Sequence, residues 1–491
     1  MKSLGFFNIN DESKATQYNT CFEKIHSGEI FDDRTARVHL GYASASAFQR
    51  FKHRFTERVK SYIFLIDTHK LKRKEEEVLH KQLWRDVALG QILSKSGGGK
   101  NARAIYHQMY PKVKENEFLD IALVILPVLN TFFSFVMPDK RLYQYYKAEL
   151  EFVIKQDAKD KLCMEYYCEV SHLHISSDLR GKVDLPDLCL GYYTELSKLF
   201  EEDDIQHFRI IAYQIGIFGH QINGTYDKAL MLCEEALRFL NKKNKIQHIH
   251  RYMVLKDTMT THLMMNNHDQ ALNYVSRIEQ MGLTYNFNYF SLQGLKFQIY
   301  AYEQKYDELY ELTHHIVNIP ELKQFSFRME QWKIKEAYVH FLLDLGLVSN
   351  ELIATKPLKA FRLNRFINQV ELHSSDKRGA NISIQIIQLL FHLKDKKYNL
   401  VLDRLDSLTQ YTHRYLRNDE TLRSNCFIKM LLKLPEAEYN PIRTKRYVAK
   451  YWQRLQSAPR VLSMQSTETE LIPYEYLWEI ILELIAPEKT N

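Results

Sequence analysis

Apolar side chains recur at three- and four-residue intervals along most of this chain, which is the spacing of one face of an α-helix. The clearest segment follows Ser44 and places five large apolar residues on a single face: Phe48, Phe51, Phe55, Val59 and Tyr62. Further long helical segments follow, separated by short polar turns, whereas the tight hairpins of β-sheets need more Gly and Pro than the 16 and 11 present here. The pattern predicts an all-α protein.

Four turns share one pattern, in which a small or polar turn precedes an aromatic residue or His and an amphipathic helix follows. The residues at this register position are Tyr226, His268, Tyr306 and Tyr398. Their intervals are 42, 38 and 92 residues. A turn near residue 347 would divide the long interval, and Asp139–Leu142 and Gly181–Val183 extend the register backwards. A period of roughly 40 residues is typical of helix pairs that bury their apolar faces only against their neighbours.

The stretch around Tyr226 resembles the second half of a tetratricopeptide repeat, a family of protein-interaction scaffolds. Its small or packing positions three, seven and ten residues after the aromatic are Ala229, Cys233 and Ala236, then Ala271, Val275 and Ile278, then Leu309, Thr313 and Ile316. The match covers residues 223–410, although the period exceeds the family's 34 residues. The resemblance implies a TPR-like α-solenoid of stacked antiparallel helix pairs.

The same resemblance implies that the chain is a non-enzymatic scaffold that binds a protein or peptide in the groove lined by the first helices of the pairs. The partner-binding positions expected on the surface of those helices are Gln214, Gln221, Lys256, Thr260 and Gln298. The alternative for these five positions is a merely solvated polar surface.

The length of 491 residues exceeds that of a usual single core, so we expect several domains or an extended array. The expected organisation is a basic helical N-terminal region (1–95), a Gly/Ser linker (96–104), the TPR-like array (105–440) and a C-terminal part (441–491). Residues 1–35 show few periodic apolar positions, which predicts loose order. The C-terminal part is expected to hold a basic helix and a capping helix.

Positive charge is concentrated near the N-terminus, where residues 36–118 hold 17 Lys and Arg against 8 Asp and Glu. Leu40–Lys52 resembles the recognition half of an AraC-type helix-turn-helix, although Phe51-Lys52 follows Arg50 one residue too early. This resemblance implies a second possibility, a regulator whose N-terminal segment binds nucleic acid and whose repeats sense a signal. The residues expected to bind nucleic acid are Arg50, Lys52, Arg54 and Arg58. A solvated basic helix face is the alternative.

Motifs for catalysis, metals and cofactors are not found in the sequence. Gly97–Lys100 lacks the earlier Gly and the following Ser or Thr of a phosphate-binding loop. A group of thiols and imidazoles is spaced so that a helix spreads them around its axis: Cys163, Cys168, His172 and His174. We therefore predict a non-enzymatic protein without a metal or cofactor. The remaining alternative is an enzyme whose site is assembled between repeats, since such a site leaves no local motif.

The sequence favours a cytoplasmic protein without a membrane partner. The six cysteines are sparse and unpatterned, as in reducing compartments. One stretch, Ile121–Met137, carries no charge, but Pro127 interrupts it and polar residues dilute it. We expect a buried helix there instead of a membrane span.

Overall fold

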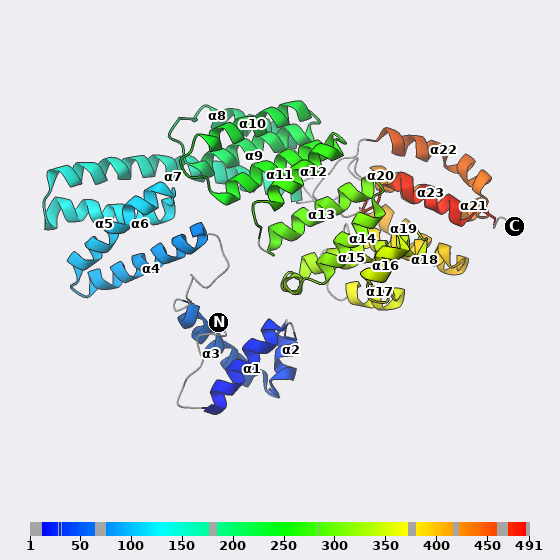
Figure 1. The fold of residues 1–491 in the computed structure, drawn as a ribbon, viewed down its shortest axis with the longest axis horizontal. Helices are drawn as coiled ribbons and strands as arrows, with labels where there is room; N and C mark the ends of the chain where they lie inside the picture. Colours follow the sequence, from blue (N-terminus) through cyan, green and yellow to red (C-terminus); the bar gives the residue numbers. More distant parts are fainter. Residues whose placement is uncertain are drawn as a thin grey trace. The chain divides into compact units, whose positions relative to one another are not determined.

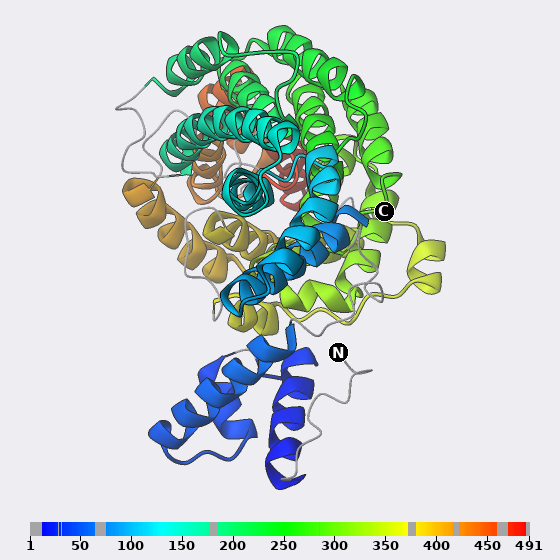
Figure 2. The same ribbon diagram turned by 90° about the vertical axis from the view of Figure 1, so that its left-hand side faces the viewer.

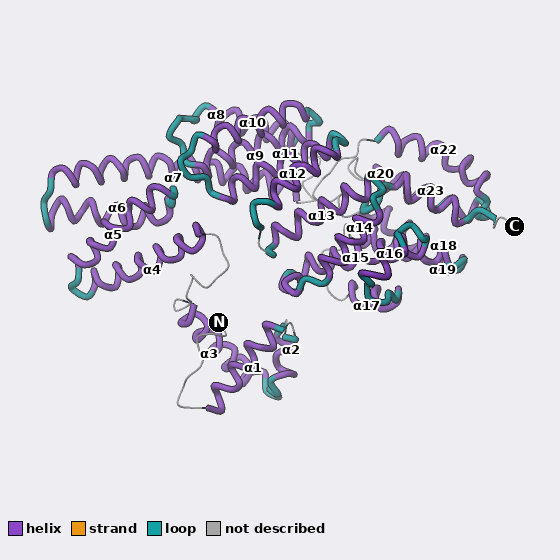
Figure 3. The backbone as a smooth tube through the Cα atoms, in the orientation of Figure 1, coloured by secondary structure: helices purple, strands orange, loops and turns teal. Residues whose placement is uncertain are grey.

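The computed structural model describes residues 12–27, 29–30, 32–63, 75–175, 184–283, 285–371, 380–415, 422–458 and 470–487. Within these ranges the chain is all-helical, and they contain no strand (Figure 3). The fold class is therefore all-α, as predicted, and the helices form a repeat-like array (Figure 1).

The elements in chain order are α1 (Glu12–His26), α2 (Asp33–His39), α3 (Ala45–Ile63), α4 (Glu75–Lys95), α5 (Gly99–Glu115), α6 (Leu119–Thr131), the π-helical η3 (Phe132–Val136), α7 (Lys140–Ile175), α8 (Leu185–Ser197), α9 (Gln206–Ile222), α10 (Tyr226–Asn241), α11 (His248–Met264), α12 (His268–Glu279), α13 (Phe287–Tyr302), α14 (Tyr306–Val317), the 3₁₀-helical η4 (Pro320–Gln324), α15 (Ser326–Asp344), α16 (Asn350–Thr355), α17 (Leu363–Glu371), α18 (Ala380–Lys394), α19 (Tyr398–Tyr415), α20 (Leu422–Leu431), α21 (Lys433–Glu436), α22 (Pro441–Ser457) and α23 (Tyr474–Leu484).

Contacts divide the chain into two units. The first comprises Met1–Val183, Gly191–Ala212 and Arg238–His250, and the second comprises Asp184–Leu190, Tyr213–Leu237 and Arg251–Asn491. In the second unit consecutive helices pack on one another: α13 on α14, α14 on α15, α18 on α19 and α19 on α20. In addition, α13 contacts α15 and α15 contacts α18, so helices two or more elements apart also touch.

One turn geometry recurs between helices. A residue with positive φ stands two positions before the next helix at Glu117, Gly224, Asn266, Gln304 and Lys396. The following N–H then donates to the carbonyl five residues earlier, for example from Thr225 to His220 and from Lys305 to Tyr300. This is the Schellman closure of a helix C-terminus, in which a left-handed residue satisfies carbonyls that the helix leaves open.

The predicted register is confirmed at four helix starts, because Tyr226, His268, Tyr306 and Tyr398 are the first residues of α10, α12, α14 and α19. Gly346 and the Leu347 N–H close α15 in the same Schellman geometry, which confirms the turn predicted near residue 347. The turn at Asp139 follows η3 and closes differently, through the carbonyl of Phe133. The proposed turn at Gly181–Val183 lies outside the described residues.

The positions three, seven and ten residues after each register residue are buried in all three copies that resemble the tetratricopeptide family. The fourth copy buries the same positions, Val401, Leu405 and Leu408. Each of these helices therefore presents one face of constant register to its neighbours, which is how a sequence repeat becomes a packing repeat.

The expectation of loose order near the N-terminus is wrong for the residues that the structure describes. Residues 12–26 and 33–39 are helical, although loose order was expected up to residue 35. The sparse apolar residues there suffice because Tyr18, Cys21 and Ala36 pack on Phe48 and Phe51 of α3 in one small core. The three helices lie together in both views (Figures 1 and 2).

The Gly/Ser segment 96–104 is not a linker. Gly97 has φ +82 and the Gly98 N–H donates to the carbonyl of Leu93, so α4 ends in a tight turn and α5 begins at Gly99. The two helices then pack along each other, and Gly90 allows a close approach, since a Cβ there would lie 2.4 Å from Tyr106. The glycines serve a turn and a helix crossing.

Candidate functional site

Gln214 and Gln221 on α9 belong to a polar network with α11. Gln214 Nε2 donates to the Asp257 carboxylate at 2.9 Å, and Gln221 Nε2 donates to the Thr261 hydroxyl at 2.9 Å. The Thr261 hydroxyl donates to the backbone carbonyl of Asp257 at 2.8 Å. Only 8% of Gln221 is exposed, so the expectation that it is a surface position is wrong. Its amide links α9 to α11. The burial of this amide is tolerated because hydrogen bonds within the protein replace those to water.

The other three expected groove positions differ among themselves. Gln298 on α13 is 2% exposed, so it is not a surface position either, because it faces the packing between helices. Lys256 and Thr260 on α11 are half-buried, and the Thr260 hydroxyl donates to the Lys256 carbonyl at 2.9 Å. The Lys256 ammonium lies 3.8 Å from the Asp257 carboxylate, whose pKa burial raises. Partner binding by Lys256 and Thr260 stays a prediction.

The helix α15 carries a different set of polar side chains, Glu330, Lys333 and Glu336. We call these three residues the α15 charge stripe. They are spaced by three residues, which places them on one face of the helix, and each is half-buried. In the part of the chain that the structure describes, none of the three forms a hydrogen bond or an ion pair, and Glu330 Oε1 is a buried acceptor without a donor.

Loss of water dominates the electrostatics of the charge stripe. Burial raises the pKa of the Glu330 and Glu336 carboxyls and lowers the pKa of the Lys333 ammonium. Within the stripe Glu336 and Glu330 favour the Lys333 charge, and Lys333 favours both carboxylate charges. Outside it, Lys359 favours the Glu336 charge and Arg365 on α17 opposes the Lys333 charge. Desolvating a charge costs free energy that only a partner group offsets. The three charges therefore offset one another only in part, and burial remains the largest influence on their pKa values.

Sequence reasoning missed the charge stripe. The run Glu330-Gln-Trp-Lys-Ile-Lys-Glu336 has the three-residue charge spacing of an ordinary solvated helix face. The signal that could have revealed it is the set of apolar residues between the charges. Trp332, Ile334 and Ala337 indicate a helix that is buried on most of its circumference. A hollow of about 210 Å³ lies further along the same helix, and its lining includes His340 on α15 and Phe361, whose rings stack on each other at 5.0 Å.

The N-terminal helices α1 to α3 form a second candidate site. The segment between α2 and α3 turns at Gly41, which has φ +70, and α3 begins at Ala45. Phe48 and Phe51 point into the small core, as their spacing predicted. Four polar residues lie exposed on one face of the first half of α3: Ser46, Gln49, Arg50 and His53. This arrangement leaves the start of α3 open to solvent.

The four cations expected to bind nucleic acid are not equivalent. Arg50 and Arg54 are exposed on α3. Lys52 donates to both oxygens of Asp33 on α2 at 2.7 Å, so its charge ties the two helices together. The Arg58 guanidinium lies 4.8 Å from the ring centroid of Tyr18 on α1, where it packs against the core. Only the first two are placed to meet an external phosphate.

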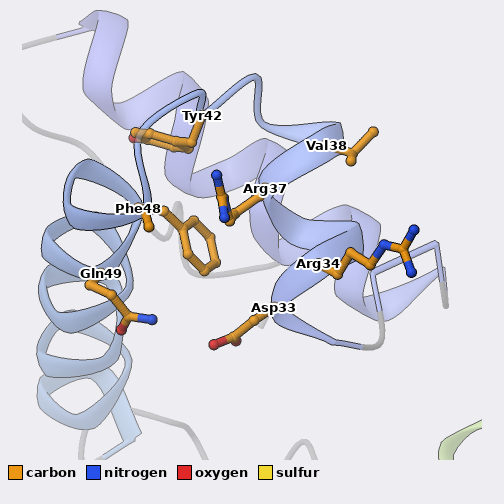
Figure 4. Close-up of a pocket in the computed structure, with 8 residues that line it drawn as sticks. Asp33, Arg34, Arg37, Val38, Tyr42, Phe48 and Gln49 are labelled. Carbon is orange, nitrogen blue, oxygen red and sulfur yellow. The ribbon is translucent and has the colours of Figure 1, made fainter.

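A hollow of about 370 Å³ lies between α2 and the start of α3 (Figure 4). Tyr42 and Phe48 form its inner wall, and Asp33 from α2 and Gln49 from α3 point towards it. Arg34 points away into solvent in the same view. The hollow therefore lies beside the exposed start of α3, on the same side as Gln49.

The acidic and sulfur-containing clusters have structural partners. Glu201, Asp203 and Asp204 form the one such group among the described residues whose ligand atoms lie close together. Lys159 donates to Glu201 at 2.9 Å and to buried Asp204 at 2.7 Å, so cations of the chain already neutralise the cluster. Cys163 is buried and donates to the carbonyl of Phe208, whereas Cys168 is exposed, so the two thiols face different surroundings.

One helical stretch in the described ranges, Leu119–Val136, has the length and composition of a membrane span. The inward positions of α6 and η3, among them Ile121, Ile125 and Leu129, are fully buried against α5 and α7. Pro127 lies inside α6. Of the whole stretch 39% is buried, and Phe135 and Val136 at its end are exposed, so the predicted buried helix is confirmed for the inward face only.

Comparison with known proteins adds no relative. No family model matches the chain, no curated protein is significantly similar to it in sequence, and no solved structure matches its fold at a significant level. The all-helical, repeat-like architecture therefore stands on the described coordinates alone.

Proposed function

We propose that the chain is a non-enzymatic, cytoplasmic scaffold that binds a protein or peptide partner along a TPR-like α-solenoid of antiparallel helix pairs. The recurring Schellman turns and the constant buried register support the solenoid, since both repeat with the helix pairs. The observation that supports partner binding is the α15 charge stripe, whose half-buried charges form no hydrogen bond or ion pair within the described part of the chain.

A partner that places opposite charges against the stripe would remove its desolvation cost. Two carboxylates flank one ammonium within two helical turns, so the complementary surface carries two cations around one acid. In this proposal Lys256 and Thr260 on α11 add contacts to the same partner. Gln214 and Gln221 hold α9 against α11 and take no part in binding.

The test is affinity purification of the tagged full-length chain from cells that express it. Changing Glu330, Lys333 and Glu336 to Ala together should reduce recovery of the specific partner at least about tenfold, because charge-assisted contacts contribute about 1.5–3 kcal/mol each. A control variant changes the exposed Asp227, Lys228 and Asp269 to Ala and should recover the partner normally. Equal recovery by both variants would reject the stripe as the binding site.

A second function is favoured by the exposed start of α3: a regulator whose N-terminal helices bind nucleic acid. In helix-turn-helix proteins the first turns of the second helix contact base edges, and Gln and Arg make bidentate contacts there. Gln49 and Arg50 stand at those positions. The binding would be measured by fluorescence anisotropy of full-length protein with duplex DNA at increasing salt.

For that second function, changing Gln49 and Arg50 to Ala should weaken binding about tenfold or more. Lys60→Ala is the control, because Lys60 lies further along α3 and pairs with Glu57 at 2.7 Å. Absence of salt-dependent binding by the unaltered protein at low ionic strength would exclude this function.

A further inference from the structure

One end of the first unit carries an exposed apolar tip, which we define as Ile92, Phe135, Val136 and Met137. Phe135 is 79% exposed and Val136 61% exposed, both at the end of η3. Ile92, in the last turns of α4, is 63% exposed. Isolated apolar side chains on a surface need no explanation, but four together with large exposed fractions indicate a contact surface.

The two parts of the apolar tip lie at the same end of the helices. The Arg103 guanidinium, near the start of α5, lies 4.7 Å from the ring centroid of Phe132 and 5.8 Å from that of Phe133 in η3. The start of α5 is thereby held beside the start of η3, and α4 also contacts α6 (Figure 1). Ile92 therefore lies towards the same end of these helices as Phe135, Val136 and Met137, which are consecutive and form the centre of the tip.

Four exposed cations accompany the tip. Lys95 and Lys100 flank the turn between α4 and α5, and Lys140 and Arg141 begin α7. None of the four makes a hydrogen bond or an ion pair with any residue that the structure describes. Asp139 is the single acid in these two turns, and one of its oxygens accepts the N–H of Leu142. The tip is thus apolar at its centre and positive at its margin.

We propose that this end of the first unit docks on the surface of an anionic lipid bilayer. Protruding Phe, Val and Met side chains enter the interface between headgroups and acyl chains, and Lys and Arg bind the anionic headgroups. The helix α6 stays in the protein core, so docking requires no span. This proposal does not depend on the proposed scaffold, and it departs from the sequence-based expectation of no membrane partner.

A second copy of the chain is a less suitable occupant than a membrane. A symmetric contact between two tips would bring eight unpaired cations to one interface, where like charges repel. A peptide partner normally fits a concave groove, whereas these side chains project from the ends of helices. Positive charge around a projecting apolar centre is complementary to a negative, deformable surface.

The experiment is co-sedimentation of the full-length protein with vesicles. The protein should bind vesicles of phosphatidylcholine with 30% phosphatidylserine, as a chosen test composition of about one-third anionic lipid, and not vesicles of phosphatidylcholine alone. Changing Phe135 and Val136 to Ser should reduce binding about tenfold or more. Changing Lys140 and Arg141 to Ala should reduce it about fivefold per charge and weaken its salt dependence, since two of the four cations remain.

Met231→Ser is the matched control, since Met231 is exposed on α10, near the acids Asp227 and Glu234, and should bind vesicles normally. All substituted side chains are exposed, so thermal unfolding should be unchanged in each variant. The proposal is overturned if the unaltered protein stays in the supernatant with anionic vesicles at low salt, or if both tip variants sediment like it. Vesicle-independent dimers that the Phe135/Val136 variant abolishes would assign the tip to a second copy.

Discussion

Polar side chains between α9 and α11 and those on α15, all in the second unit, differ in their hydrogen bonding. Gln214, Gln221 and Thr261 each have a hydrogen-bond partner across the helix pair. Glu330, Lys333 and Glu336 have none among the described residues, although they too are withdrawn from water. Paired buried groups stabilise a fold, whereas unpaired ones cost stability and persist for another reason. The difference separates structural polar groups from candidate binding groups.

The buried guanidinium of Arg423 on α20 is a charge with several partners within the chain. Its guanidinium donates to Glu470 at 2.6 Å, to Glu475 at 2.7 Å and to the carbonyl of Leu455 at 2.9 Å. Arg423→Met would leave two carboxylates without their cation and should lower the free energy of unfolding by about 3–5 kcal/mol. Denaturant unfolding measures this. Arg443→Met, which removes only the exposed pair with Glu438, should change it by less than about 1 kcal/mol. Similar losses in both variants would contradict the account.

His250 is another buried polar side chain, and its Nδ1 atom has no hydrogen-bond partner. Burial lowers its pKa from 6.5 to about 3, so the folded chain binds fewer protons than the unfolded chain between these values. Stability should therefore fall as pH falls below 6.5, by about 2 kcal/mol at pH 5 relative to pH 7. His250→Gln should remove this part of the pH dependence in denaturant unfolding. An unchanged slope in the variant would show that His250 titrates normally.

The network between α9 and α11 is predicted to be structural. Gln221→Ala would leave the Thr261 hydroxyl without its donor and open a small space between the helices, so the free energy of unfolding should fall by about 1–2 kcal/mol. Partner recovery should be unaffected at saturating concentration. A variant with unchanged stability and lost partner would move Gln221 to the binding residues.

A substitution in the charge stripe should raise the free energy of unfolding, whereas Gln221→Ala lowers it. Lys333→Met keeps the aliphatic stem, removes a desolvated charge and should raise the free energy of unfolding by about 0.5–1 kcal/mol. Lys228→Met on the exposed surface of α10 is the control and should have almost no effect. A loss of stability in Lys333→Met would mean that the ammonium has a stabilising partner within the chain.

The sequence predicted where helices begin better than it predicted which of their polar residues are buried. Helix starts at Tyr226 and Tyr306 could be located because a turn and a fixed apolar register surround them, and both are local properties. Gln221 and Glu330 could not be told apart in this way, since both are polar residues on amphipathic helices. Their burial depends on the angle at which the next helix packs, which no short window of sequence contains.

The Gly/Ser segment shows the same limit. Gly97 and Gly98 look like a linker by composition, but in the structure they close α4 and start α5. Composition indicates how freely the backbone moves in the unfolded chain. Whether the folded chain is ordered there depends on tertiary packing, such as the close approach of α4 to α5 at Gly90 and Tyr106.

Site-specific photo-cross-linking tests the central claim most directly. A benzophenone side chain placed at position 333 in the full-length chain, in cells that express it, should give a discrete adduct with the partner, and the same group at position 228 on α10 should give none. The account is contradicted if the partner co-purifies with the chain while position 333 gives no adduct, or if both positions give the same adduct in equal yield.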